Sequence, residues 1–147
     1  MLKKIKNLLV KFFTKFLALD RFYFERIVLT KDFLQQAISY AAESHPYECF
    51  GLLHGTVKDK RLYLISVVFV PHSSEKTNVV TKPLIFNSVT EWGTIHSHPS
   101  GNIRPSKEDL ITFSKNPVNI IIGHPYSSSK ISIYNQDGKL LGFEIEY

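Results

Sequence analysis

The chain has 147 residues, of which 44% are hydrophobic and 21% charged, which fits one globular domain and excludes a wholly disordered protein. Its net charge of +5 comes from residues 1–26, which contain seven basic and two acidic side chains. Residues 27–147 contain eleven basic and eleven acidic side chains and have no net charge. The neutral part gives no indication of a nucleic-acid surface, and the single cysteine, Cys49, excludes an intramolecular disulfide and zinc sites that need a cysteine pair.

The spacing of apolar and basic side chains in residues 1–26 predicts a basic amphipathic helical extension. Over residues 2–19 apolar side chains recur at helical spacing on one face, while Lys4, Lys11 and Lys15 share the opposite face. These lysines interrupt the apolar run, so we expect neither a membrane-spanning helix nor a signal peptide, and we predict a cytoplasmic protein. Such a helix packs on its own domain, forms a homodimer, or makes peripheral contact with an anionic membrane. All three alternatives stay open.

The sequence patterns of residues 27–147 predict one domain that contains both helices and strands. Residues 20–29 either continue the first helix or link it to a second one at 31–43, for which Thr30 is a good cap. A third helix is expected at about 106–114. Strands are expected at 49–54, 61–70, 79–87, 93–98, 118–123, 130–134 and 140–145. The last two strands flank the sequence Asn-Gln-Asp-Gly and read as a hairpin.

Several side chains that can bind a metal ion lie within residues 96–109. His96 and His98 end an expected strand, where residues two apart point to one face, so both imidazoles can reach the same ion. A turn rich in Gly, Asn and Pro then brings the chain back. Ser106 is the expected N-cap of the next helix, and Asp109 lies in its first turn. The segment therefore predicts a metal site of His96, His98 and Asp109.

Three protein ligands are typical of catalytic zinc, because they leave a tetrahedral ion one position for water. Zinc brings the pKa of such a water close to neutrality and polarises a carbonyl group. A hydrolase of this kind also needs a group that moves protons. Glu48, beside a short apolar strand, is the leading candidate. The sequence thus predicts a hydrolase with one catalytic Zn2+.

This spacing resembles the signature of the JAMM/MPN+ zinc metallopeptidases, which is His-x-His-Pro, six residues, Ser, two residues and Asp. It begins here at His96 and ends at Asp109, with no departure at a signature position. Upstream, the run from Glu48 to Gly55 resembles the family's Glu-x-x-Gly-x-x-x-Gly region. The resemblance covers about residues 30–135, as in a prokaryotic or archaeal single-domain member.

The resemblance implies a fold and a role for each site residue. The fold is α+β, a mixed curved β-sheet packed with helices and ending in a C-terminal β-hairpin. His96, His98 and Asp109 would bind zinc. Glu48 would act as general base and Ser106 would support the oxyanion. The implied reaction is cleavage of the peptide or isopeptide bond after the C-terminal tail of ubiquitin or a ubiquitin-like modifier, whose conjugate would be the substrate.

Two other function classes remain as alternatives. The HPSG and PSxxD elements also resemble RadC-like proteins, which have been associated with DNA, but this chain lacks room for their extra N-terminal helical domain. A non-proteolytic scaffold of the same fold, recruited to a membrane, would have no use for Glu48. We therefore favour the peptidase and expect no nucleic-acid partner.

Several other reactive or aromatic side chains are expected to be structural. Cys49 alternates with Glu48 along a strand and so points away from it, which favours a small core residue over a nucleophile. Trp92 is expected in the core. His54, His72 and His124 have no matching ligand set, although His124 follows a strand and is also able to line the cleft.

Overall fold

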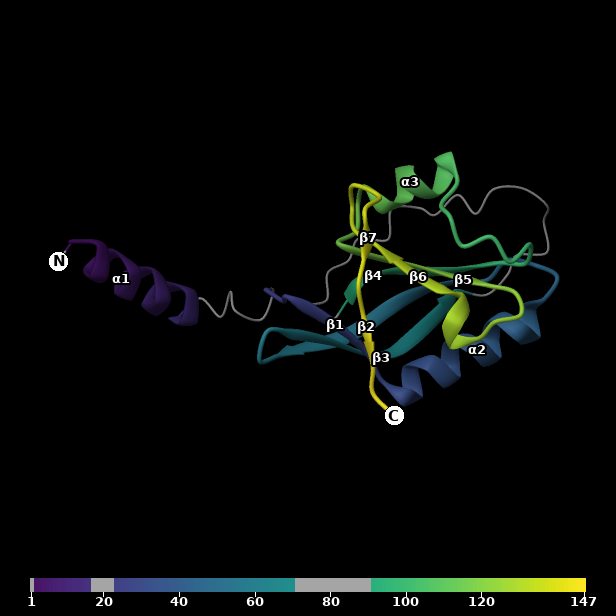
Figure 1. Cartoon of the computed structure of the whole chain (residues 1–147), viewed down its shortest axis with the longest axis horizontal. Helices are drawn as coiled ribbons and strands as arrows, with labels where there is room; N and C mark the ends of the chain where they lie inside the picture. Colours follow the sequence, from purple (N-terminus) through teal and green to yellow (C-terminus); the bar gives the residue numbers. More distant parts are fainter. Residues whose placement is uncertain (1, 17–22, 71–90) are drawn as a thin grey trace.

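The computed structural model describes residues 2–16, 23–70 and 91–147, and for residues 14–16 it describes the backbone alone (Figure 1). The helices are α1 (Leu2–Phe16), α2 (Lys31–Ser44), α3 (Lys107–Phe113) and the 3-10 turn η2 (Ser128–Lys130). The strands are β1 (Arg26–Leu29), β2 (Phe50–Lys58), β3 (Arg61–Val70), β4 (Glu91–His98), β5 (Val118–Gly123), β6 (Ile131–Tyr134), β7 (Leu140–Leu141) and β8 (Glu144–Ile145). The strand expected at 79–87 lies outside the described residues.

The described strands form one mixed sheet in the order β7-β6-β5-β4-β2-β3-β1-β8. β4 pairs in parallel with β5, and β1 in parallel with β3 and β8, while the remaining neighbours are antiparallel. β7 and β8 lie at opposite edges, yet only Gly142 and Phe143 separate them in sequence. A flat sheet of this width would set its edges about 34 Å apart, whereas three Cα steps span at most about 11 Å. The sheet is therefore strongly curved, as the fold prediction required.

The two faces of the sheet carry separate apolar clusters. α2 covers one face with Phe33, Leu34, Ala37 and Ala41, and Thr30 caps it by accepting a hydrogen bond from the Phe33 N–H at 3.2 Å. Successive residues of β5 alternate between the faces, so Ile120 and Ile122 join the α2 side. Ile121 instead packs with Phe113 of α3 and with Tyr134. The face that carries α3 is the one that holds the candidate site.

Helices α2 and α3, strand β3 and the turn after β6 confirm the sequence predictions, and α1 confirms the first helix as far as Phe16. Two predictions were wrong. Residues 20–29 were expected to be helix or linker, but Arg26–Leu29 forms β1, whose four residues are too few to show a period. Residues 140–145 were expected to be one strand. They form β7, which pairs with β6, and β8, which pairs with β1 across the curved sheet.

Candidate metal centre

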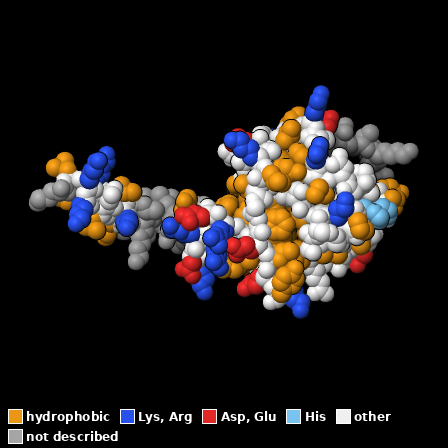
Figure 2. Space-filling model, viewed as in Figure 1, with side chains coloured by type: hydrophobic (Ala, Val, Ile, Leu, Met, Phe, Trp, Pro, Cys, Tyr) orange, Lys and Arg blue, Asp and Glu red, His pale blue; other side chains and the backbone are white. Residues whose placement is uncertain are grey.

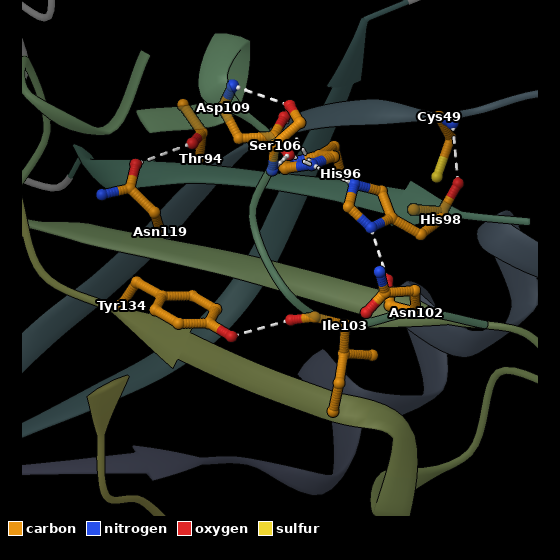
Figure 3. A network of polar contacts seen from close by, with 11 residues as sticks. Cys49, Thr94, His96, His98, Asn102, Ile103, Ser106, Asp109, Asn119 and Tyr134 are labelled. Atoms are coloured by element: carbon orange, nitrogen blue, oxygen red, sulfur yellow. Dashed lines mark hydrogen bonds and ion pairs between the residues drawn. The ribbon is translucent and has the colours of Figure 1, made fainter. Parts of the chain in front are cut away.

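His96 and His98 lie at the end of β4, a central strand between β2 and β5. Their imidazoles project from the same face, as the two-residue spacing predicts, and their Nε2 atoms are 2.9 Å apart. The side chains are 11% and 13% exposed, so both rings are largely shielded from water. Figure 3 shows the two rings turned toward Asp109. β4 therefore supplies two nitrogen donors aimed at one point.

Asp109 reaches these rings from the first turn of α3. Ser106 caps this helix, because its Oγ accepts from the Asp109 N–H at 3.1 Å, and the Ser106 N–H donates to Asp109 Oδ2 at 2.7 Å. Asp109 Oδ1 lies 3.1 Å from His96 Nε2, and Oδ2 lies 3.4 Å from His98 Nε2. The capping box thus fixes both where α3 begins and where the carboxylate points.

The three side chains are strongly coupled electrostatically. Burial alone would raise the pKa of the Asp109 carboxyl, but hydrogen bonds from His96 and His98 outweigh burial and hold this pKa well below its usual range. The hydrogen bond to Asp109 is in turn the main cause that raises the pKa of His98, against burial, which would lower it. The carboxylate is therefore ionised at any physiological pH, as a metal ligand must be.

The donor atoms fit a small tetrahedral ion. One ligand atom from each of His96, His98 and Asp109 lies within 4.8 Å of the others. A tetrahedral zinc ion with bonds of about 2.0–2.1 Å holds its ligand atoms about 3.3 Å apart. The two Nε2 atoms lie 2.9 Å apart, and each has one of the two Asp109 oxygens at a similar distance, 3.1 Å for Oδ1 and 3.4 Å for Oδ2. His98 Nδ1 hydrogen-bonds the Asn102 carbonyl, which leaves Nε2 free to face an ion. The set suits zinc both in chemistry and in spacing.

Glu48 lies next to this set, on the stretch that leads into β2. Phe50 of β2 pairs with His96, and the Ser97 N–H donates to the Cys49 carbonyl at 3.0 Å. Continuing this register by one more residue sets Glu48 opposite His98, where side chains share a face. Glu48 is exposed, and its negative charge adds to the raised pKa of His98. Glu48 is thus an exposed acidic residue close enough to His98 for its charge to act on that ring.

The turn after β4 is held by backbone contacts. The His98 carbonyl accepts from the N–H groups of Gly101 and His124, at 3.0 and 3.1 Å. Gly101 has φ +79°, and a Cβ there would come within 2.8 Å of the His124 carbonyl oxygen, so glycine is required. The Tyr134 hydroxyl donates to the Ile103 carbonyl at 2.8 Å and ties the turn to β6. These contacts hold the path from His98 to α3.

The comparisons with known proteins agree with this geometry. The family described as "Prokaryotic homologs of the JAB domain" matches residues 30–134. The chain belongs to this family. A curated protein of Haloferax volcanii, a "probable metalloprotease", is 34% identical over 129 residues, which cover 82% of this chain and 80% of that protein.

Two solved structures extend the comparison. A JAB1/MPN domain protein from Archaeoglobus fulgidus is 29% identical, with a TM-score of 0.63, over 82% of this chain and 98% of that one. The second structure, described as "JAMM: a metalloprotease-like zinc site in the proteasome and signalosome", is 26% identical with a TM-score of 0.63, over 84% and 100% of the two chains. The resemblance to JAMM/MPN+ proteins is thereby confirmed, and so are the α+β fold and zinc as the cofactor. The same findings support a metallopeptidase.

Other side chains of this JAB-domain protein match their structural interpretation. Cys49 is 1% exposed, lies in the α2-side core, and has a pKa raised by burial, so its thiol is neutral and belongs to the core. Trp92 is buried and donates from Nε1 to the Gly55 carbonyl at 3.1 Å. The His124 ring is exposed beside that of His45, with centroids 4.9 Å apart. His72 lies outside the described residues.

Sequence reasoning missed several residues that support the site. Asn102 acts through its backbone carbonyl on His98, and a carbonyl leaves no mark in a sequence. Ser97 was passed over between the two histidines, yet its Oγ accepts from the Cys49 N–H at 2.8 Å and so fixes β2 against β4. Its position opposite Cys49 follows from the register between β2 and β4, which the sequence does not reveal. The distant Tyr134 gave no signal either, because its contact spans 31 residues of sequence.

Proposed function

We propose that this protein is a zinc-dependent isopeptidase that cleaves the bond after the C-terminal tail of ubiquitin or a ubiquitin-like modifier. The observation that carries the proposal is the convergence of His96, His98 and Asp109 on one point, with the exposed carboxylate of Glu48 on the same face. We assign the first three side chains as the ligands. Zinc, when bound there, supplies a Lewis acid that polarises the scissile carbonyl.

Glu48 is the proton-transfer group of the proposed reaction. Its carboxylate is exposed, so it can accept a proton from the attacking water and then donate that proton to the leaving amine. Cys49, the neighbour of Glu48, is not suited to act as a competing nucleophile, because burial raises the pKa of its thiol and keeps it neutral. The reaction therefore runs by attack of water rather than through a covalent enzyme intermediate.

Ser106 has one hydrogen-bonding function left after capping α3. Its oxygen accepts from the Asp109 N–H, which leaves the hydroxyl hydrogen able to donate. We assign this donor to the oxyanion that develops as water attacks the carbonyl. The same residue thus holds Asp109 in place and stabilises the transition state.

A protein substrate is supported by the metalloprotease family and by the surface beside the site. Leu110 and Ile111 directly follow Asp109 and are 41% and 65% exposed. An extended apolar tail segment can pack on such side chains as it enters the site. A ubiquitin-like tail, flexible and joined to a lysine of another protein, meets this requirement without unfolding of the substrate.

Cleavage of modifier conjugates tests the proposal. The full chain, loaded with zinc, is incubated with conjugates of several ubiquitin-like proteins, with and without a chelator. We expect cleavage that the chelator abolishes and added zinc restores. Glu48→Gln should bind zinc normally and lose about 10²–10⁴ in turnover, whereas Glu43→Gln, a matched exposed glutamate on α2, should keep it.

Four outcomes would count against parts of the proposal. Cleavage that survives the chelator contradicts a zinc mechanism. Full turnover by Glu48→Gln contradicts its role as the base, and full cellular function of that variant favours the scaffold alternative. Cleavage of unfolded peptides, with no modifier conjugate cleaved, retains the metallopeptidase and refutes the modifier as substrate.

A further inference from the structure

Helix α1 exposes both apolar and basic side chains. Every side chain from residue 2 to residue 13 is exposed, including Leu8 at 72% and Phe12 at 66%. Five lysines and no acidic residue lie in Leu2–Phe16. Figure 2 shows both kinds of side chain on this helix. Exposure of large apolar side chains over three turns indicates a surface that contacts something other than water.

Apart from Val10, the apolar and basic side chains occupy different sides of the helix. At about 100° per residue, Ile5, Leu8, Leu9 and Phe12 fall within one arc. Lys4 and Lys11 lie together on one flank of this arc, Lys6 lies on the other flank, and Lys3 lies opposite the arc. Lysines at the border of an apolar face can keep their stems in a nonpolar layer while their charges reach the polar surface. This is the arrangement of a helix that lies in the plane of a membrane interface.

We propose that α1 binds the surface of an anionic lipid bilayer and attaches the JAB domain to it. The apolar arc would enter the boundary between headgroups and acyl chains, and the lysines would contact lipid phosphates and carboxylates. This proposal is independent of the peptidase activity. Among the described residues no helix is long and apolar enough to cross a membrane, which agrees with surface attachment.

Charge favours a bilayer over a second copy of the chain. Two copies of α1 would bring ten lysines together, because each helix has five lysines and no acidic residue to pair with them. An anionic bilayer instead supplies the compensating negative charge. Residues 27–147 carry no net charge, so they neither add to this attraction nor oppose it. The basic charge of the protein is therefore concentrated at the helix that would touch the membrane.

Vesicle co-sedimentation of the full chain tests this proposal. The vesicles contain phosphatidylcholine alone, or phosphatidylcholine with 30% phosphatidylserine. We expect binding to the anionic vesicles that weakens as salt rises, and little binding to the neutral ones. Lys4→Glu/Lys11→Glu should reduce binding more than about tenfold, since each basic residue near such a surface strengthens binding about fivefold. Leu9→Glu should reduce it as well, because it places a charge in the apolar arc.

The matched control is Lys115→Glu/Lys139→Glu, which makes the same change in net charge at exposed lysines of the sheet domain. This variant should bind like the unchanged protein. The proposal would be overturned if the two double variants bound anionic vesicles equally well. It would also be overturned if the unchanged protein bound neutral and anionic vesicles equally, or bound neither kind. A stable dimer in solution that Leu9→Glu converts to monomer while vesicle binding is absent would overturn it as well, because α1 would then serve a second copy. Peptidase activity enters none of these measurements.

Discussion

Replacement of Ser106 separates a structural role from a catalytic one. Its Oγ accepts from the Asp109 N–H at 3.1 Å and caps α3, a helix of seven residues. Loss of such a cap costs about 1 kcal/mol when alanine replaces serine, but only a few tenths when glycine does. In a chain of this size about 1 kcal/mol lowers the melting temperature by roughly 2–4 °C. Ser106→Ala should show that shift, and Ser106→Gly much less of it.

The catalytic role predicts a different pattern, because alanine and glycine both lack the hydroxyl donor. Removal of one oxyanion donor typically lowers turnover about 10²–10³-fold. Both variants should therefore lose activity equally, although their stabilities differ, and Ser106→Thr should retain most of both. Thermal unfolding and chelator-controlled turnover, each measured on zinc-loaded protein, give the two quantities. Wild-type turnover in Ser106→Gly would refute the donor role, and equal melting temperatures for all variants would refute the cap.

Three further outcomes are expected. Apparent zinc affinity should fall as the pH drops, because only neutral imidazole binds the ion. The fall should occur at a pH above the ordinary histidine pKa of about 6.5, since Asp109 raises the pKa of His98. An affinity that stays constant from pH 8 to pH 5.5 in calorimetry would contradict this. Gly93→Ala should destabilise the fold by more than about 3 kcal/mol in urea unfolding, because a Cβ would lie 1.7 Å from the Val118 carbonyl oxygen. Cys49→Ala should leave turnover unchanged, and an inactive but folded variant would show that the buried thiol matters to the chemistry.

The sequence predicted the metal face well because local rules govern it. Strand alternation brings His96 and His98 to one side, and the capping box of Ser106 and Asp109 is set by four consecutive residues. These rules depend on neighbours in the chain. The three ligand atoms could therefore be expected to meet once the turn between them was recognised.

The features that the sequence did not predict depend on distant contacts. β1 forms because Ile27, Val28 and Leu29 are buried beside β3, more than thirty residues away. β7 and β8 separate because the sheet curves until its edges approach, which no six-residue window reveals. The place of Glu48 opposite His98 likewise follows from the register between β2 and β4. The expected boundary between the N-terminal extension and the domain, after residue 26, stays a prediction.

Zinc content of purified variants tests the central claim most directly. The unchanged protein and Glu48→Gln should each hold one zinc ion per chain after dialysis, as measured by elemental analysis. His96→Ala, His98→Ala and Asp109→Asn should each lose it while keeping the far-ultraviolet spectrum of the folded protein. Retention of one tightly held zinc in all three ligand variants, or its absence from the unchanged protein after loading with zinc, would contradict the assignment of His96, His98 and Asp109 as the zinc site.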